Sequence, residues 1–237
     1  MISLVIPAYN EARLLPRLLD SVDKARLRYA GGVQVIVADN ASTDATPTLA
    51  LRRGCDVARV EKRCIAAARN GGARLATGDS VCFIDADSSI HPDTFKAIDE
   101  ALARPDVVGG ATGVYPERWS IGIVATWTAM MPMVWATGMD TGVVYCRRAD
   151  FEALGGYDEK REFAEDVVFM WALKRLGAKR GQKLSRLTRV KAMASMRKFD
   201  RHGDWHYLTG VFGVAWAFLF SRRRLDRWIR TYWYEDR

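Results

Sequence analysis

The stretch CFIDADSSI, residues 82–90, joins an apolar run to two acidic residues. Val81 to Ile84 are apolar and predict a buried strand. Asp85 and Asp87 follow at once, and because residues i and i+2 of a strand share a face, we expect their carboxylates side by side. One interpretation is a turn whose acids are solvated or cap a helix. The other is a divalent cation held by carboxylate oxygens, which suits Mg²⁺ or Mn²⁺.

Strands and helices alternate around this stretch. The pattern predicts strands at 2–6, 33–38, 56–60 and 80–84, and helices from about Pro16, at 45–53, at 65–76 and from Pro92. This order predicts an α/β fold, a Rossmann-like, mostly parallel sheet with helices on both faces. Polar clusters follow three of the strands, at 7–11, 39–44 and 85–89. Ligands bind beyond the carboxyl ends of parallel strands, so we expect the clusters to form one site.

The second half of the chain has a less regular pattern. It predicts strands at 107–115 and 142–148, and a helix at 165–177 that Gly177 would end. The stretch 119–136 between the two strands carries no charge. Trp119, Trp127 and Trp135 recur within it at a spacing that indicates one helical face. Core packing is the first interpretation of these tryptophans, and a wall for an acceptor is the second.

Composition indicates a globular protein, because 49% of the 237 residues are hydrophobic and 27% are charged. Residues 1–173 carry 19 Lys+Arg and 23 Asp+Glu, a net −4, whereas residues 174–237 carry 17 and 5, a net +12. A basic C-terminal quarter suits nucleic acid, an anionic membrane surface or a phosphate-bearing substrate. A solvated basic face is the alternative.

The cysteines and the first residues bear on location. Cys55, Cys64, Cys82 and Cys146 include no CxxC pair, so we expect reduced, mostly buried thiols in a cytosolic protein. The run MISLVIPAYNE has no basic region before its short apolar stretch, so a signal peptide is not expected. The expected location is cytoplasmic, with a peripheral position on the inner face of the membrane as a refinement.

Five segments carry a family resemblance. They are, in chain order, VIPAYNE, VIVADNASTDAT, AAARNGGARLATGDSVCFIDADS, FEALGGYDE and EDVVFMWALKRLG. Together, over about residues 2–177, they resemble the family 2 glycosyltransferases. The resemblance implies a GT-A fold at 1–200, with a nucleotide-binding half at about 1–90 and an acceptor half at about 91–200. A tail with apolar and basic helical character would follow at 201–237.

The resemblance also implies an activity and its site. The activity is inverting transfer from a nucleotide-diphosphate sugar to an acceptor hydroxyl. Since the QxxRW-type motif of processive members is absent, transfer of a single sugar is expected. The DxD motif would place Mg²⁺ or Mn²⁺ on Asp85 and Asp87, and Asp166 would be the general base, with Glu165 beside it. The implied nucleotide-sugar-binding residues are Pro7, Tyr9, Glu11, Asp39, Arg69, Asp85, Ala86 and Arg197.

One departure from the family pattern bears on the donor. Many members have two acids after the second strand, but here Ala38 precedes Asp39 and Asn40 follows it. A UDP-sugar is the favoured donor, and the single acid leaves the nucleobase open.

The C-terminal tail contains an apolar run, WHYLTGVFGVAWAFLF, at 205–220. Sixteen residues are shorter than the roughly 20 that a membrane-spanning helix needs. A helix in the membrane interface fits its aromatic residues and basic flank, and would suit an anionic membrane surface and a lipid-linked acceptor. The alternatives are a helix packed on the protein's own core or a homodimer through the C-terminal helix.

Three other functions compete with the enzyme. A catalytically silent sugar-nucleotide-binding or membrane-scaffold protein is disfavoured, because Asp85, Asp87 and Asp166 are all present. A nucleic-acid-binding protein would fit the charge, but no recognition motif is found, so no nucleic-acid partner is expected. A sugar-nucleotide pyrophosphorylase would need a Gly-rich, Arg-containing loop after the first strand, and PAYNEAR is not such a loop.

Overall fold

A computed structural model describes residues 1–161, 164–206 and 208, with the backbone alone at Met133. The chain divides into two compact units. The first combines Met1–Tyr115 with Gly138–Ala194, and the second combines Pro116–Thr137 with Ser195–Arg237. The two units are described separately.

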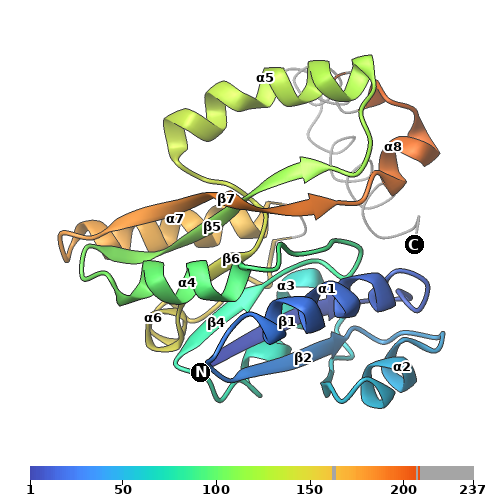
Figure 1. Cartoon of the computed structure of the whole chain (residues 1–237), viewed down its shortest axis with the longest axis horizontal. Helices are drawn as coiled ribbons and strands as arrows, with labels where there is room; N and C mark the ends of the chain where they lie inside the picture. The colour runs from blue at the N-terminus through green and yellow to red at the C-terminus, as the bar shows by residue number, and fades with distance from the viewer. Residues whose placement is uncertain (162–163, 207, 209–237) are drawn as a thin grey trace. The chain divides into compact units, whose positions relative to one another are not determined.

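The first unit is built on a seven-stranded sheet with the order β3-β2-β1-β4-β6-β5-β7 (Figure 1). Its strands are β1 (Ile2–Ala8), β2 (Val33–Asp39), β3 (Asp56–Arg59), β4 (Ser80–Phe83), β5 (Val107–Pro116), β6 (Val144–Arg147) and β7 (Lys183–Ala194). The first four strands pair in parallel, and β6 pairs antiparallel with both β4 and β5. The sheet is therefore parallel where the polar clusters follow its strands, and β6 is antiparallel to both of its neighbours.

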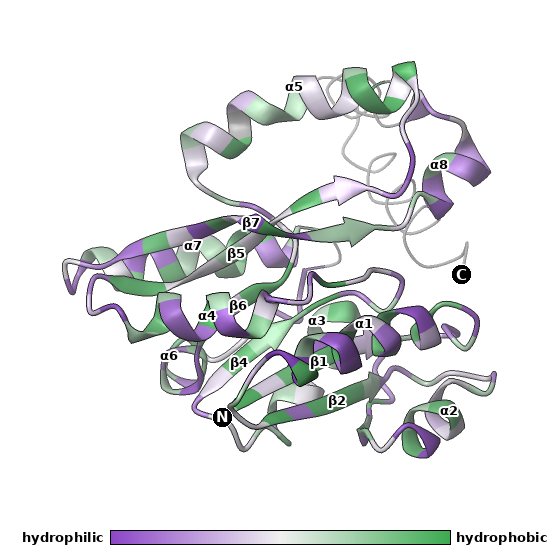
Figure 2. Ribbon diagram, in the orientation of Figure 1, coloured by the Kyte–Doolittle hydropathy of each residue, from purple (hydrophilic) through white to green (hydrophobic). Residues whose placement is uncertain are grey.

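Helices cover both faces of this sheet. They are α1 (Leu15–Leu27), α2 (Thr46–Arg52), α3 (Ile65–Ala73), α4 (Thr94–Ala103), α6 (Arg148–Ala153) and α7 (Glu165–Ala178). Leu4 and Ile6 of β1 pack into one apolar cluster with residues of α1 and α4. Val5, which points the other way, packs into a second cluster with residues of α3 and α7. Hydrophobic residues colour β1, whereas hydrophilic ones recur on the outer face of α1 and α4 (Figure 2). The expected α/β fold with helices on both faces is confirmed.

The structure corrects the sequence interpretation in the second half of the chain. β7 was not expected, since its exposed and half-buried residues show no clear alternation. Gly177 does not end α7, which runs to Ala178. A Cβ at Gly177 would lie 2.7 Å from a methyl group of Val108, so the glycine allows the helix to pack closely on β5. The four cysteines are buried free thiols, as expected.

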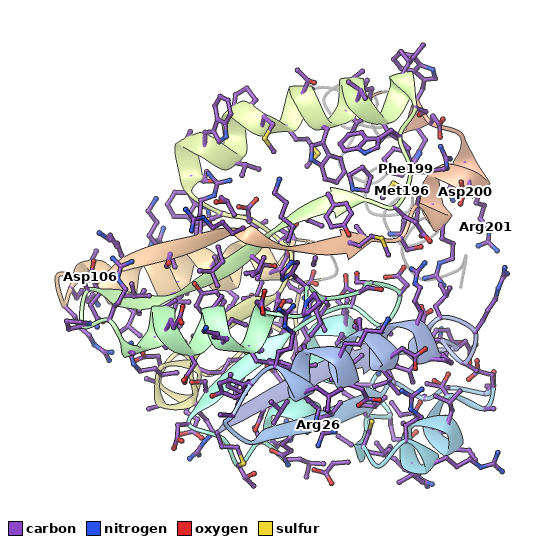
Figure 3. The ribbon with its side chains drawn as sticks, viewed as in Figure 1. Arg26, Asp106, Met196, Phe199, Asp200 and Arg201 are labelled. Atoms are coloured by element: carbon purple, nitrogen blue, oxygen red, sulfur yellow. The ribbon has the colours of Figure 1, made fainter. Side chains whose placement is uncertain are left out.

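The second unit contains α5 (Ile121–Thr137) and α8 (Arg197–His202). The Arg118 guanidinium binds the carboxylates of Asp200 and Asp204, at 2.6 and 2.7 Å, and so ties the start of α5 to α8. Figure 3 shows Phe199, Asp200 and Arg201 on α8, with Met196 just before it.

The expected core packing of the tryptophans in this unit is wrong for two of them. Trp119 is 58% exposed and Trp135 is 70% exposed. Ile121, Val124 and Met130 of α5 are also exposed, so an uncharged helix does not bury all of its apolar surface within the described residues. None of the helices that the structure describes has the length and apolar character to cross a membrane. The predicted tail helix lies outside the described residues, apart from its first few.

Candidate active site

The expected meeting of three polar clusters is confirmed by the order of the strands. β1 lies between β2 and β4, and all three run in parallel, so their carboxyl ends share one edge of the sheet. The register pairs Ala8 with Asp39 and Val5 with Phe83. Asp85 therefore follows the end of β4 two residues beyond Phe83, at the same edge.

Hydrogen bonds join the first two clusters. The Asn10 amide N–H donates to Ser42 Oγ at 3.0 Å, and Asn10 Oδ1 accepts from the Thr43 N–H at 2.9 Å. The Glu11 N–H donates to Thr46 Oγ1 at 2.8 Å. Asn10 has a φ of 53°, which turns the chain sharply after β1. The turn brings the backbone of Glu11 against the start of α2 and leaves Pro7 buried within β1.

Asp39 and Asn40 have different tasks at the end of β2. Asp39 is 7% exposed and accepts a 3.2 Å hydrogen bond from the Ser42 N–H. The Asn40 side chain donates to the carbonyls of Val60 and Lys62, at 3.0 and 2.6 Å, and accepts from the Cys64 N–H. A carboxylate could not make those two donations. Asparagine at this position is therefore explained by the loop that it holds.

Arg69 of α3 links the acids of two distant segments. Its guanidinium donates to Asp85 Oδ1 at 3.1 Å and to Glu165 Oε1 at 2.5 Å. The Arg69 side chain is 8% exposed and that of Glu165 is 10% exposed, whereas that of Asp85 is 55% exposed. Burial alone would lower the pKa of Arg69, but the nearby Asp85 and Glu165 carboxylates raise it above its ordinary value. A permanent cation thus lies between two predicted site acids.

The two acids that open α7 have different surroundings. Glu165 is buried and paired with Arg69, and burial raises the pKa of its carboxyl although the Arg69 charge lowers it. Asp166 is half-buried, and its Oδ1 accepts a 2.8 Å hydrogen bond from the Val167 N–H. Ala164, just before them, has a left-handed backbone with a φ of 55°. Glu165 is therefore fixed as the partner of Arg69, and Asp166 is the more accessible acid.

Asn70 has a positioning role that its sequence context did not reveal. It exchanges two hydrogen bonds with the backbone of Tyr157: its Nδ2 donates to the carbonyl at 2.9 Å and its Oδ1 accepts from the N–H at 2.8 Å. Nδ2 also donates to Glu159 Oε1 at 3.0 Å. A Cβ on Gly156 would lie 2.5 Å from Asn70 Oδ1, which explains a glycine there. The FEALGGYDE segment is thereby fixed to α3.

Tyr9 and Ala86, two further predicted residues, follow β1 and β4. Tyr9 lies under the Arg63 guanidinium, whose carbon is 3.6 Å from the centre of the tyrosine ring. Ala86 is buried and contributes its backbone between the two aspartates. The carbonyl of Asp87 accepts a 2.6 Å hydrogen bond from Arg17. Arg197 belongs to the second unit, and its predicted contact with the nucleotide sugar stays a prediction.

The acid pair has the donor chemistry that a hard divalent cation needs. The Asp85 carboxylate is half exposed, and Arg69 occupies its Oδ1. Within the described residues, no group of three or more His, Cys, Asp or Glu side chains is arranged to hold a metal ion. Mg²⁺ keeps several water or phosphate ligands and needs only one or two carboxylates. The residues present therefore fit a cation whose other ligands come from a diphosphate and water.

Comparison with known families decides the affiliation of the chain. The model of the family "Glycosyl transferase family 2" matches residues 3–203. The chain belongs to this family. The matched range takes in both aspartates after β4, Arg69 and the acids that open α7.

Curated relatives resemble the chain over parts of their length. The pre-mycofactocin glycosyltransferase of Mycobacterium tuberculosis is 27% identical over 197 residues, which are 75% of this chain and 40% of that protein. The validoxylamine A glucosyltransferase of Streptomyces hygroscopicus subsp. jinggangensis is 33% identical over 112 residues, which are 44% of this chain and 26% of that protein. The chain thus spans less than half the length of either relative.

Solved structures confirm the GT-A-type fold. A fragment of S. aureus TarS in complex with UDP-GlcNAc has a TM-score of 0.64 at 19% identity, covering 82% of this chain and 58% of that one. The mannosyltransferase PcManGT from Pyrobaculum calidifontis, in complex with GDP-Man and Mn²⁺, has a TM-score of 0.63 at 23% identity, covering 81% and 56%. At these identities the likeness is one of fold.

Proposed function

We propose that this family 2 glycosyltransferase moves one sugar from a nucleotide-diphosphate sugar to an acceptor hydroxyl, with inversion at the anomeric carbon. The observation that carries the proposal is the link through Arg69. One buried guanidinium brings the acids after β4 and the acids that open α7 to the same edge of the sheet. That edge is where α/β sheets bind their ligands.

The nucleotide half of the donor would lie over the ends of β1 and β2. Tyr9 offers an aromatic face, and the buried Asp39 carboxylate can accept hydrogen bonds from base or ribose donors. The backbone N–H of Glu11 donates a hydrogen bond to the Thr46 hydroxyl at the start of α2, which fixes this segment before a ligand arrives. A UDP-sugar remains the favoured donor in this proposal, as does a contact from Arg197.

Asp85 and Asp87 would hold Mg²⁺ or Mn²⁺ together with the diphosphate, and the ion would stabilise charge on the leaving group as a Lewis acid. PcManGT, of similar fold, was solved in complex with GDP-Man and Mn²⁺. Arg69 orients the Asp85 carboxylate through their 3.1 Å contact. Ala86 lies between the two aspartates in the sequence and anchors this segment, because its small side chain is buried in the apolar cluster.

Asp166 is assigned as the general base. In a single displacement the acceptor oxygen forms a bond to the anomeric carbon while the carbon–oxygen bond to the diphosphate breaks and its electron pair stays on the diphosphate. The acceptor proton passes to the Asp166 carboxylate. Glu165 is less suited to this task, because it is buried and its Oε1 is bound by Arg69.

The acceptor in this proposal is lipid-linked and reached at an anionic membrane surface. Support comes from α5, which carries no charge over its length and exposes Trp135, Ile121 and Met130 within the described residues. Aromatic and apolar side chains of this kind favour the boundary between lipid and water. A peripheral cytoplasmic location stays a prediction, as does dimerisation through the C-terminal helix.

Isothermal titration calorimetry with UDP, GDP and ADP, each in Mn²⁺ and in EDTA, tests the donor half of the proposal. We expect one of the three nucleotides to bind in the Mn²⁺ buffer. The affinity of the same nucleotide should be measurably weaker in EDTA. Hydrolysis of the matching radiolabelled nucleotide sugar then tests catalysis, with Asp166→Asn as the inactive control. Absence of binding for every nucleotide would refute the proposal, and binding without turnover would favour the silent sugar-nucleotide-binding protein.

A further inference from the structure

Arg63 and Tyr9 form a contact that the roles proposed so far do not use. The Arg63 guanidinium carbon lies 3.6 Å from the centre of the Tyr9 ring, which is close stacking contact. Tyr9 follows β1, and Arg63 lies in the loop between β3 and α3. Since a planar base would occupy the same face of the tyrosine, the guanidinium fills the volume that a stacked nucleobase needs.

The backbone that carries Arg63 is held firmly on both sides. Asn40 binds the carbonyls of Val60 and Lys62 and the N–H of Cys64. The Lys62 ammonium also pairs with Glu159 at 3.0 Å. Arg63 itself is exposed. A ligand that reaches Tyr9 therefore meets a fixed loop and a long side chain that moves by rotation about its own bonds.

We propose that Arg63 is a nucleobase-binding residue, which covers the Tyr9 ring in the empty site and stacks on the outer face of the base in the filled one. This inference rests on the proposed nucleotide-sugar function. In the filled site the base lies between the tyrosine ring and the guanidinium, and the guanidinium moves outward by about one stacking distance. The ligand class is the planar base of a nucleoside diphosphate.

The energies favour this exchange. An exposed contact between a guanidinium and an aromatic ring is weak. Stacking of a base on an aromatic side chain is stronger, and a guanidinium plane stacks on the second face of a base in the same way. Breaking one weak contact thus allows two planar contacts to form. The side chain also shields the Tyr9 ring from water until the base arrives.

The Asn40 side chain links the loop that carries Arg63 to the residue proposed to recognise the base. It binds the Arg63 loop, and its neighbour Asp39 presents the buried carboxylate assigned to base or ribose. The Asn40 side chain therefore fixes the distance between Arg63, which would stack on the base, and Asp39, which would form hydrogen bonds with it. An acid at position 40 would lose the two donations and release the loop.

The test is calorimetric titration of UDP and GDP into the wild-type protein and into Arg63→Ala, Arg63→Lys and Arg52→Ala. We expect Arg63→Ala to weaken binding of the preferred nucleotide about fivefold or more, the scale of one lost stacking contact. Arg63→Lys should weaken it similarly, because lysine keeps the charge and loses the plane. Arg52, an exposed arginine in the last turn of α2, is the control and should be neutral.

Each outcome separates this inference from the proposed function. Unchanged or tighter binding by Arg63→Ala would show that the arginine only obstructs Tyr9, and would overturn the inference while leaving the function standing. Full binding by Arg63→Lys would assign the effect to charge and would also overturn it. Failure of the wild-type protein to bind any nucleotide would instead overturn the proposed function. The thermal unfolding midpoint of each variant shows that the fold is kept.

Discussion

The edge of the sheet beyond β1, β2 and β4 differs from α5 in what holds it. At the sheet edge, Arg69, Asn70 and Asn40 each bind two or more groups, and the Arg69–Glu165 contact spans 96 residues of sequence. α5 has an uncharged sequence and exposes much of its apolar surface within the described residues. Arg118, just before α5, forms ion pairs with Asp200 and Asp204 and so ties the start of α5 to α8.

This difference shows that the sheet edge depends on the exact position of each group, whereas α5 depends on the kind of residue it carries. The sheet edge needs particular atoms at particular places, so most single changes there should remove a partner from a buried group. α5 needs only an apolar, aromatic surface, so its residues should be exchangeable for others of the same kind. Substitutions in the two regions test this contrast.

Removal of the central cation should have the largest effect. Arg69→Met leaves the Glu165 carboxylate buried without its partner, and breaking a buried ion pair in this way costs about 3–5 kcal/mol of folding free energy. Urea unfolding at neutral pH measures it. Arg59→Met, at the exposed end of β3, is the matched control and should stay within about 0.5 kcal/mol of the wild type. A loss below 1 kcal/mol for Arg69→Met would contradict the assigned role.

Loss of the proposed general base should come next. Asp166→Asn should keep the fold and nucleotide binding but lower turnover by about 10²-fold or more, which is the scale of general-base catalysis. Steady-state kinetics with the identified donor measures it. Asp158→Asn, an exposed acid in the neighbouring loop, is the control and should turn over normally. If Asp166→Asn is nearly as active as the wild type, the base lies elsewhere, with Glu165 as the first candidate.

Removal of a proposed metal ligand should give a smaller but specific change. Asp87→Ala should weaken nucleotide binding in Mn²⁺ by about tenfold or more, because it removes one of two carboxylates from the ion. In EDTA the variant and the wild type should bind alike. Calorimetry in both buffers measures these affinities. Equal affinities of Asp87→Ala and the wild type in Mn²⁺ would contradict the metal assignment.

The Glu165 carboxyl should give stability a modest dependence on pH. Burial raises its pKa in the folded protein, so the folded state holds a proton that the unfolded state has released. Its contribution is fully present below the ordinary pKa of glutamate and is lost as the pH rises through the raised value. Glu165→Gln should lack this decline. Urea unfolding across mildly acidic to neutral pH measures both slopes, and identical slopes would contradict the pKa shift.

Changes on α5 should have the smallest effect on folding. Met130→Lys places a charge on an exposed position and should change the folding free energy by at most about 0.5 kcal/mol. If α5 meets lipid, the same change should lower the fraction of protein that sediments with phosphatidylglycerol vesicles. Met130→Leu is the control and should sediment like the wild type. Wild-type protein that stays in the supernatant at low salt would refute the proposed binding to an anionic membrane surface.

Much of the sheet edge was predictable because its signals are local. Apolar runs followed by Asp39 or Asp85 indicate strands that end in polar groups, and parallel order brings those ends together. The partners of Arg69 and Asn70 were not predictable, because each meets residues more than 85 positions away, through contacts that leave no periodic pattern.

The second half of the chain was harder to predict for other reasons. β7 mixes exposed and half-buried residues, so it lacks the alternation that marks a strand. The uncharged stretch of α5 is compatible with a core, a partner or a lipid surface, and composition alone does not distinguish them. The expected burial of Trp119 and Trp135 therefore failed, and Trp119 precedes α5, so the three tryptophans do not share one helical face.

The long separation between Arg69 and Glu165 has a consequence for the order of folding. Closing a loop of 96 residues costs roughly 4 kcal/mol of chain entropy, before any contact repays it. During synthesis the parallel strands β1 to β4 can pair while residues beyond α6 are still unmade. The corner where the acids meet can form only after α7 has emerged, so it should be the last part of the sheet edge to become protected from hydrogen exchange.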